Sequence, residues 1–275
     1  MARRAELTAC IITFNEERNL PDALASVAFA DEIVMVDSRS TDRTREIAAA
    51  FRGRAPGGEE VAPRVIERDW PGHVEQKNFA IDQATHDWVL CVDADERVSP
   101  ELRREVEEAL SRDPPGADGY TMPRKTHYLG RWILHGGWYP DRKLRLFRRS
   151  RGRWGGTNPH DHVHVDGIVK RLRGDLYHYS YRGMADHLRT IDSFTAISAR
   201  EKARKGVRWP ILRMGIHPPF KFFKMYILKQ GFREGVVGLI VAMLGSFYVF
   251  LKYAKLWELR EREWKDTPPG GEPGT

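Results

Sequence analysis

The chain has 275 residues, which is enough for one large domain with additions or for two small domains. It carries 45 Lys and Arg against 38 Asp and Glu, which gives a net charge of +7. Its two cysteines, Cys10 and Cys91, both lie in apolar runs, so we exclude a disulfide-stapled miniature and a paired-cysteine zinc site, and we expect two core thiols in a reducing compartment.

The first 110 residues alternate between apolar runs of strand length and segments with helical spacing. Strands are predicted at 7–14, 32–37, 64–69 and 87–95, and helices at 19–30, 41–51, 73–85 and 100–110. This alternation is typical of βαβ units, so we expect an α/β fold with a parallel, doubly wound sheet that binds ligands at the carboxyl ends of its strands. The first apolar run becomes polar too soon for a signal peptide, so we expect the chain to begin in the cytoplasm.

Residues 120–180 are rich in aromatic residues, Arg, His and Gly. Alternating side chains in "KLRLFRR" (143–149) and "HVHVDG" (162–167) predict antiparallel strands with one face in water. We therefore expect a mixed extension beside the parallel sheet. The final segment, 266–275, lacks apolar residues and is predicted to be disordered.

The C-terminal part combines basic and apolar segments. From Lys202 to Arg233 every charged residue is basic, and the apolar run 236–251 then falls short of the roughly 18–20 residues of a spanning helix. We expect this part to lie on or dip into an anionic membrane surface. A buried core helix with a solvated basic face and a true spanning helix are the alternatives, and nucleic acid is not expected as a partner because a long apolar helix adjoins the basic patch.

Polar groups follow three of the predicted strands, in "TFNEE" (13–17), "VDSRSTD" (36–42) and "VDADE" (92–96). Any one of these acids can simply cap a helix, but in a parallel sheet all three strand ends meet along one edge. Asp93 and Asp95 are two residues apart, so on an extended chain their carboxylates point the same way and can hold one divalent cation. Such a cation can bind a pyrophosphate and neutralise a departing nucleoside diphosphate.

Together with other stretches, these residues resemble the inverting family 2 glycosyltransferases of the GT-A fold, in particular the WaaE/KdtX-type β-glucosyltransferases of lipopolysaccharide core biosynthesis. The stretches are "ACIITFNEERNL", "ADEIVMVDSRSTDRT", "WPGHVEQKNFAID", "DWVLCVDADERVSPEL", "YLGRWILHGGWYPDRKLRLFRR", "LYHYSYR" and "FLKYAKLWEL". The resemblance implies a Rossmann-like GT-A fold with a nucleotide-sugar-binding part (1–115), an acceptor and catalytic part (116–185) and a helical, membrane-associating region (186–265). The family commonly has glycine where this chain has Arg39 and Arg43.

The resemblance also implies roles for individual residues. The nucleotide sugar would be held by Thr13, Asn15, Glu16, Asp37, Gln76, Lys77, Asn78, Asp93 and Glu96. Within this set Asp37 would bond the base or ribose, Lys77 would lie near the base or phosphates, and Glu96 would orient Arg97 or the sugar. Asp95 would be the main ligand of Mg²⁺ or Mn²⁺, and Asp93 would face ribose or metal. His178 would complete the metal shell or touch the pyrophosphate, unless it is a packed core histidine.

An inverting transfer needs a carboxylate that removes the proton of the acceptor hydroxyl. The His-Glu pair of the family corresponds here to His160 and Asp161, so Asp161 is the first candidate for the base, and Asp141 is the second. The alternation of His160, His162 and His164 would also suit zinc. Only His160 matches the family, so we expect the other two histidines at the surface.

The stretch "LGRWILHGGWYP" (129–140) is predicted to face the acceptor, because aromatic rings stack on sugars and Arg binds phosphorylated sugars. The acceptor-side residues are Arg131, Trp132, His135, Trp138 and His160. A core aromatic cluster is the alternative interpretation of the stretch.

We therefore predict a metal-dependent, inverting hexosyltransferase, peripheral or monotopic at the cytoplasmic face of the inner membrane. It would move a hexose from a nucleotide-diphosphate sugar, expected to be UDP-linked, to a lipid-anchored glycan such as lipopolysaccharide core. One alternative is a sugar-nucleotide pyrophosphorylase, although "TFNEERN" lacks the glycine-rich phosphate loop. The other is a catalytically silent, membrane-associated nucleotide-binding scaffold, although Asp37, Asp93 and Asp95 are all present.

Overall fold

The computed structural model describes residues 4–55, 57–111, 116–157 and 160–266. Over these residues the chain forms two compact units. Unit 1 takes in Met1–His127 and Tyr139–Ser180, and unit 2 takes in Tyr128–Trp138 and Tyr181–Thr275. The boundaries expected at residues 115 and 185 stay predictions, and the predicted disordered tail lies outside the described residues apart from Asp266, which ends a helix.

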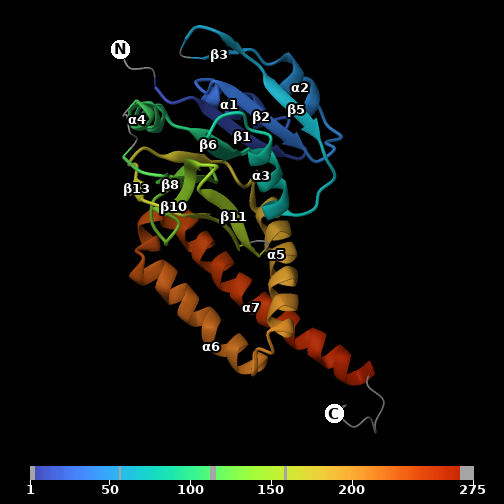
Figure 1. The fold of residues 1–275 in the computed structure, drawn as a ribbon. Helices are drawn as coiled ribbons and strands as arrows, with labels where there is room; N and C mark the ends of the chain where they lie inside the picture. Colours follow the sequence, from blue (N-terminus) through green and yellow to red (C-terminus); the bar gives the residue numbers. More distant parts are fainter. Residues whose placement is uncertain (1–3, 56, 112–115, 158–159, 267–275) are drawn as a thin grey trace. The chain divides into compact units, whose positions relative to one another are not determined.

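Unit 1 is built on one large sheet (Figure 1). In spatial order its main strands are β5 (Pro63–Glu67), β2 (Glu32–Asp37), β1 (Leu7–Thr13), β6 (Trp88–Asp93), β10 (Asp141–Arg148), β8 (Gly119–Tyr128), β14 (Leu176–His178) and β7 (Glu96–Val98), and β13 (Val169–Arg171) pairs with β8. The first four are parallel, whereas β10 runs antiparallel to both of its neighbours. The predicted α/β class, with a mixed extension beside a parallel sheet, is confirmed.

Helices cover both faces of this sheet because the strand residues alternate in direction. The helices are α1 (Leu20–Val27), α2 (Thr44–Ala50), α3 (His73–Asp82) and α4 (Pro100–Leu110). On β1, Leu7 and Ile11 pack in a cluster with apolar residues of α1 and α4, while Cys10 packs with Ala80 and Ile81 of α3. Each fully buried Leu or Ile contributes roughly 1.5–3 kcal/mol. Cys10 and Cys91 are free and buried, as predicted.

Two small antiparallel hairpins complete unit 1. One joins β3 (Gly53–Arg54) to β4 (Glu60–Val61), and the other joins β11 (Gly152–Thr157) to β12 (His160–Val165). The predicted antiparallel pairing in this part of the chain is confirmed. The register of the second hairpin sets Gly156 opposite Asp161.

Unit 2 is mostly helical. Its elements are β9 (Arg131–Ile133), α5 (Met184–Arg204), α6 (Pro210–Phe223), the π-helical turn η1 (Lys224–Leu228), the 3₁₀ turn η2 (Gly231–Glu234) and α7 (Gly235–Asp266). The apolar run 236–251 alone is too short to span a membrane, but the amphipathic sequence after it continues the same helix. By length and composition alone, Gly231–Glu261 is long and apolar enough to cross a bilayer.

Two apolar clusters hold unit 2 together. Tyr128, Met225 and Val241 belong to the first cluster, and Ala199 of α5 and Leu256 of α7 belong to the second. The Ser246 hydroxyl also donates to the Pro218 carbonyl at 2.8 Å, which ties α7 to α6. One side of α7 is therefore occupied by protein.

Candidate active site at the carboxyl edge of the sheet

The polar ends of the three predicted strands come together in unit 1. In the β1–β2 register Thr13 lies beside Asp37, and in the β1–β6 register Ile12 lies beside Asp93. Because these strands are parallel, their carboxyl ends share one edge. The predicted convergence of "TFNEE", "VDSRSTD" and "VDADE" is confirmed.

Asp37 and Asn15 join the loops that follow β1 and β2. The Asp37 carboxylate is fully buried and accepts hydrogen bonds from the backbone N–H of Ser40 at 2.9 Å and its hydroxyl at 2.5 Å. Asn15 Oδ1 accepts from the Thr41 N–H at 2.8 Å, and the Asn15 N–H donates to Ser40 Oγ at 2.9 Å. Both side chains shape the edge of the site, and their contacts with a nucleotide stay predictions.

Thr13 and Glu16 occupy different surroundings in the first loop. Among the described residues, the buried Thr13 Oγ1 has no hydrogen-bond partner. Glu16 Oε2 accepts from the Asn19 amide at 2.8 Å, and the Glu16 backbone N–H donates to Thr44 Oγ1. Thr13 is thus the residue of this loop with an unused polar atom for a ligand.

The departure from the family at residue 39 has a backbone explanation. Arg39 has a φ of +62°, in the left-handed region that favours glycine. Its guanidinium is exposed and pairs with Asp69, and the exposed Arg43 pairs with Glu46. The loop keeps the conformation that suits a glycine, with an arginine in its place.

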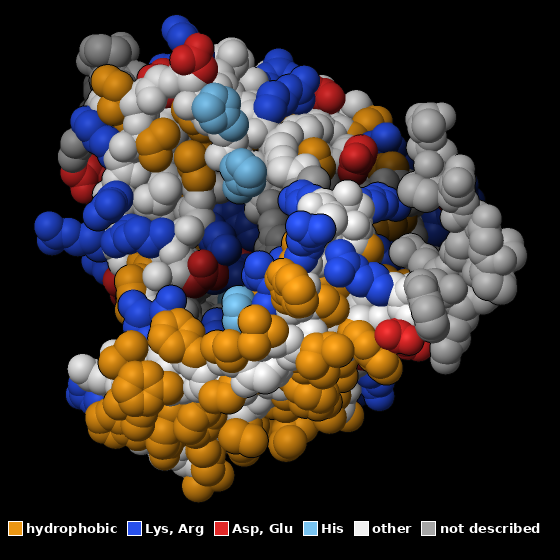
Figure 2. Space-filling view, turned by 90° about the horizontal axis from the view of Figure 1, so that it is seen from below, with side chains coloured by type: hydrophobic (Ala, Val, Ile, Leu, Met, Phe, Trp, Pro, Cys, Tyr) orange, Lys and Arg blue, Asp and Glu red, His pale blue; other side chains and the backbone are white. Residues whose placement is uncertain are grey.

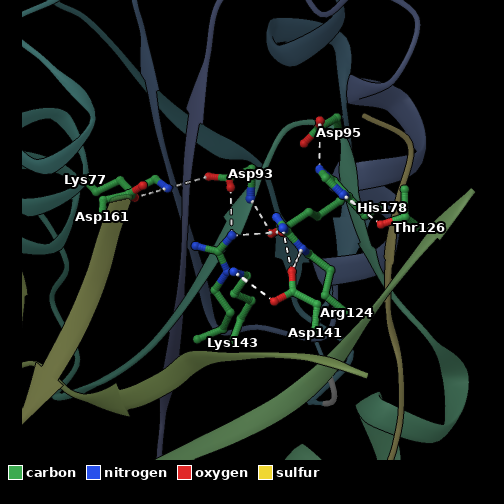
Figure 3. A network of polar contacts seen from close by, with 11 residues as sticks. Lys77, Asp93, Asp95, Arg124, Thr126, Asp141, Lys143, Asp161 and His178 are labelled. Carbon is green, nitrogen blue, oxygen red and sulfur yellow. Dashed lines mark hydrogen bonds and ion pairs between the residues drawn. The ribbon is translucent and has the colours of Figure 1, made fainter. Parts of the chain in front are cut away.

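A network of charged side chains lies at the end of β6 (Figure 3). Asp93 Oδ2 is 2.7 Å from the guanidinium of Arg145, and Asp93 Oδ1 is 3.2 Å from the ammonium of Lys77. Burial alone would raise the pKa of Asp93, but the charges of Arg145 and Lys77 outweigh it and hold the pKa well below its usual range. Asp93 is therefore ionised and held by two cations.

Lys77 links Asp93 to the predicted base. Its ammonium is 2.8 Å from Asp161 Oδ2 and lies 4.3 Å from the ring centre of Trp154. Burial would raise the pKa of Asp161, but the Lys77 charge prevails and lowers it. The carboxylate of Asp161 is thus ionised, mostly buried and directed into the cluster, as Figure 3 shows.

The neighbours of Lys77 hold α3 in place. The Asn78 amide donates to the Trp154 carbonyl and accepts from its N–H, both at 3.0 Å, so Asn78 clamps β11 to α3. Gln76 is fully buried and donates to Ser38 Oγ at 3.2 Å. Of the three residues predicted to hold the nucleotide here, Lys77 is the one that reaches the carboxylates.

Asp95 forms a second, separate pair with His178. Asp95 Oδ2 and His178 Nε2 are 3.3 Å apart, and His178 Nδ1 lies 3.4 Å from Thr126 Oγ1. The expectation that Asp93 and Asp95 point the same way is wrong, because β6 ends at Asp93 and the chain turns at Ala94 and Asp95. Figure 3 shows the two carboxylates directed to different partners.

The Asp95–His178 pair fits a divalent cation. Two ligands at right angles on one Mg²⁺ or Mn²⁺ lie about 3 Å apart, and Mg²⁺ often takes only one or two carboxylates with the rest of its shell from phosphates and water. Among the described residues, no group of three or more His, Cys, Asp and Glu side chains is gathered as a metal site. A cation here would therefore depend on the phosphates of the donor for further ligands.

Glu96 and Asp141 both pair with Arg124, and Glu96 also pairs with Arg145. Glu96 is fully buried and accepts from Arg145 at 2.8 Å and from Arg124 at 3.4 Å. Asp141 accepts from Arg124 at 2.7 Å and pairs with Lys143 at 3.1 Å. Burial opposes ionisation of Asp141, but Arg124 and then Lys143 lower its pKa. The expected link from Glu96 to Arg97 is wrong, and the alternative contact of Glu96 with the sugar stays a prediction.

Arg97 instead stacks on Tyr179 and pairs with Asp22, since β7 turns its side chain away from the arginine pair. His162 and His164 are exposed, as predicted. Of His160 only the backbone, at the start of β12, is described.

Arg145, Arg124 and Trp154 are site residues that sequence reasoning missed. On β8, Arg124 lies two residues from the buried Met122 and from the buried Thr126, so its side chain points to the same face of the strand as theirs. An arginine at an inward-facing strand position was the available signal. Arg145 gave no such signal, because the register of β10 shifts between Leu144 and Leu146. The water-facing surface expected for that strand is wrong at Arg145, which is almost fully buried.

Replacing Arg145 with leucine is expected to lower the free energy of unfolding by about 3–5 kcal/mol, because the carboxylates of Asp93 and Glu96 would each lose a cationic partner. Arg39→Leu, which breaks an exposed pair, is the matched control and is expected to cost less than about 1 kcal/mol. Urea unfolding of the two variants measures the difference. Equal losses would show that the Arg145 pairs do not support the fold.

Four of the predicted acceptor-side residues belong to unit 2. His135 Nδ1 is 2.6 Å from Glu234 Oε1, and Arg131 pairs with the same buried carboxylate. Trp138 packs beside Tyr128 and Tyr181 in the aromatic cluster that was the alternative interpretation. Trp132 is partly buried. Their contact with an acceptor stays a prediction.

The sequence matches known proteins over most of its length. Residues 8–171 match the model of the family described as Glycosyl transferase family 2. The lipopolysaccharide core biosynthesis glycosyltransferase LpsC of Rhizobium meliloti (strain 1021) is 30% identical, with 94% of each chain covered. The uncharacterized glycosyltransferase RT0209 of Rickettsia typhi is 29% identical, over 92% of this chain and 87% of that protein.

Solved structures are similar at lower identity. The mannosyltransferase PcManGT from Pyrobaculum calidifontis, in complex with GDP-Man and Mn²⁺, is 15% identical with a TM-score of 0.48, over 98% of this chain and 77% of that one. TarS 1–349 of S. aureus, in complex with UDP-GlcNAc, is 15% identical with a TM-score of 0.45, over 98% of both chains. The match of the family model over more than half of the sequence, and of LpsC over nearly all of it, is decisive. This chain belongs to glycosyl transferase family 2 and has the α/β, GT-A type of fold expected from the resemblance.

Proposed function

We propose that this glycosyltransferase is a metal-dependent, inverting enzyme that moves a hexose from a nucleotide-diphosphate sugar, with UDP as the expected nucleotide, to a lipid-anchored glycan. The observation that carries the proposal is the gathering of Lys77, Asp93, Asp161 and the Asp95–His178 pair beside the carboxyl ends of the parallel strands of unit 1. The name of LpsC supports lipopolysaccharide core as the acceptor.

Asp161 is proposed to act as the general base. An ionised carboxylate can take the proton of an acceptor hydroxyl as that oxygen attacks the anomeric carbon from the side opposite the nucleotide. Asp161 meets this requirement because its pKa is lowered. Lys77, between Asp161 and Asp93, is the ammonium available to the phosphates of the donor.

Asp95 and His178 would hold the divalent cation, which supplies positive charge to the departing nucleoside diphosphate. Arg145 and Glu96 have a positioning role, since they fix Asp93 beside Lys77. In this scheme Asp93 faces ribose or Lys77 and is not required to complete the metal shell. Thr13 Oγ1, buried and unpaired among the described residues, is a further contact for the nucleotide.

A donor panel tests the proposed reaction. The purified chain is incubated with UDP-, GDP- and dTDP-linked hexoses, Mn²⁺ or Mg²⁺, and a truncated lipopolysaccharide core. We expect release of nucleoside diphosphate from one donor, in proportion to sugar transferred and only with acceptor and cation present. Formation of a nucleotide sugar from a sugar 1-phosphate, without transfer, would instead support a pyrophosphorylase.

The membrane is the proposed location of unit 2, because two of its helical segments expose stripes of apolar side chains. The first stripe comprises Trp209, Leu212, Ile216, Phe220, Phe223 and Ile227, and the second comprises Val236, Leu239, Met243, Phe247 and Phe250. Within each stripe the residues are three or four apart, so they share one helix face. Figure 2 shows hydrophobic side chains gathered over one face.

These stripes favour a helical hairpin that lies in the membrane interface. A helix that spans alone meets lipid on all sides, whereas α7 uses one side to pack with α5 and α6 and exposes the other. The basic residues of 202–233 would then contact anionic lipid headgroups. We propose a monotopic or peripheral protein at the cytoplasmic face of the inner membrane.

The double variant Phe220→Glu/Phe247→Glu is expected to dissociate from anionic vesicles, because it places two negative charges on the apolar stripes. The control is Ile168→Glu/Val169→Glu, which adds the same charge at exposed apolar residues of unit 1. Sedimentation with phosphatidylglycerol vesicles is the measurement, and we expect binding to fall at least tenfold in the first variant alone. Equal retention of both variants would contradict interfacial attachment.

A further inference from the structure

Unit 2 contains a cavity of about 480 Å³ that no step of the proposed sugar transfer uses. Part of its lining is apolar and comes from α5 and α7, through Ile191, Phe194, Val241 and Leu244. Trp138 adds an aromatic wall. The volume lies within the range of small-molecule sites and suits a headgroup with part of one acyl chain.

Three lysines line the same cavity. Lys221 comes from α6, Lys224 from η1, and Lys229 from the segment after it. Within the described part of the chain, no carboxylate pairs with any of the three. Burial, and then the charge of Lys224, lowers the pKa of Lys221. An anion between these two ammonium groups would therefore offset the free energy cost of burying one positive charge beside another.

The walls of the cavity are held by contacts within unit 2. The Gly136 N–H donates to the Lys229 carbonyl at 2.8 Å, which fixes the glycine loop against the lysine segment. His187, another lining residue, has Nδ1 2.9 Å from Tyr128 Oη and stacks on Tyr181. Burial lowers the pKa of His187 to about 4, so this ring is neutral at pH 7 and the lysines supply the positive charge.

We infer that this cavity binds a phosphorylated lipid, with the phosphate between Lys221, Lys224 and Lys229 and an acyl chain against the apolar wall of α5 and α7. The chemistry required is a phosphate attached to an acyl-bearing lipid, in a headgroup that keeps a net negative charge. Such a lipid can come from the bilayer or from the lipid part of the acceptor. The inference deepens the proposed function and rests on its membrane location. Its test needs no sugar transfer.

Native mass spectrometry of the full chain in non-ionic detergent tests the inference. Dimyristoyl phosphatidic acid is expected to bind at least tenfold more tightly than dimyristoyl phosphatidylcholine, whose headgroup carries no net charge. Inorganic phosphate and lipid A are the other two probes. Tighter binding of lipid A than of phosphatidic acid would assign the cavity to the acceptor lipid, and the reverse order would assign it to bilayer phospholipid.

The variant Lys221→Gln/Lys224→Gln is expected to lose at least tenfold in affinity for phosphatidic acid. The control Lys202→Gln/Lys205→Gln removes the same charge at the end of α5, outside the cavity lining, and should change the affinity less than twofold. A matched loss in both variants would mean that phosphatidic acid is held by general surface charge, which overturns the inference.

Thr190→Trp fills the cavity from α5 and keeps every lysine. It should abolish phosphatidic acid binding while sedimentation with anionic vesicles stays unchanged, which separates the cavity from the exposed stripes. Circular dichroism checks that each variant is folded, and the lysine variants carry the test alone if Thr190→Trp is not. Equal binding of phosphatidic acid and phosphatidylcholine, or binding of inorganic phosphate as tight as that of phosphatidic acid, would overturn the inference.

Discussion

Replacing Asp161 with asparagine is expected to lower kcat by about 10²–10⁴-fold, the usual contribution of a positioned general base. Asparagine keeps the shape of the side chain but cannot accept the proton of the acceptor hydroxyl. Lys77 would still pair with Asp93, so the charged cluster should stay assembled. The KM for the nucleotide sugar is therefore expected to change by less than about threefold, and steady-state kinetics separates the two parameters.

Asp141→Asn is the matched comparison for the base. Asp141 is also ionised and beside the cluster, but both of its oxygens are used by Arg124 and Lys143. We expect this variant to retain most of the kcat. If Asp141→Asn loses more of the kcat than Asp161→Asn, the base is Asp141 and not Asp161.

Replacing Asp95 with alanine is expected to remove the dependence on divalent cations along with nearly all turnover. A cation that neutralises the leaving diphosphate contributes several kcal/mol, which corresponds to about 10²–10³-fold or more in rate. The variant leaves His178 as the single protein ligand of the Asp95–His178 pair. Titration of Mn²⁺ into the assay should restore activity to the parent chain after chelation and leave the variant inactive.

Asp22→Ala is the control for this experiment, because Asp22 is an exposed carboxylate of unit 1 that pairs only with Arg97 among the contacts described. It should keep the activity and cation requirement of the parent. Full turnover of Asp95→Ala in excess chelator would contradict a metal role for the Asp95–His178 pair.

The parallel core of unit 1 was predictable because its sequence pattern is local. The strands at β1, β2, β5 and β6 are short apolar runs, and their order along the chain fixes which ends face the ligand. Thr13, Asp37 and Asp93 thus came together as expected. The polar residues that follow each strand can be read from the sequence, even though their neighbours in space cannot.

The partners of those residues were not predictable, because they depend on contacts far apart in the sequence. Lys77 and Asp161 are 84 residues apart, and the link depends on the Asn78 clamp that holds β11 to α3. Arg145 reaches Asp93 from a strand whose alternation is broken by a register shift. The turn after β6, which separates Asp93 from Asp95, likewise overrides the two-residue spacing.

Unit 2 shows the same division between pattern and partners. The basic and apolar character of residues 202–251 was evident from the sequence. It did not show which lysines form surface ion pairs and which line a cavity. In the structure Lys205 pairs with Glu201, while Lys221 and Lys224 line a cavity. The helix periodicity predicts an apolar face, but only the packing shows which of its residues are buried and which remain exposed.

Isothermal titration of UDP into the full chain, with Mn²⁺ and with chelator, is the decisive measurement for the proposed site. The claim is that the carboxyl edge of the sheet binds a nucleotide diphosphate through a cation held by Asp95 and His178. We predict that Mn²⁺ tightens the Kd for UDP at least tenfold in the parent chain and has no such effect in Asp95→Ala. Equal affinity of the parent chain for UDP with and without Mn²⁺, or no binding of UDP under either condition, would contradict the claim.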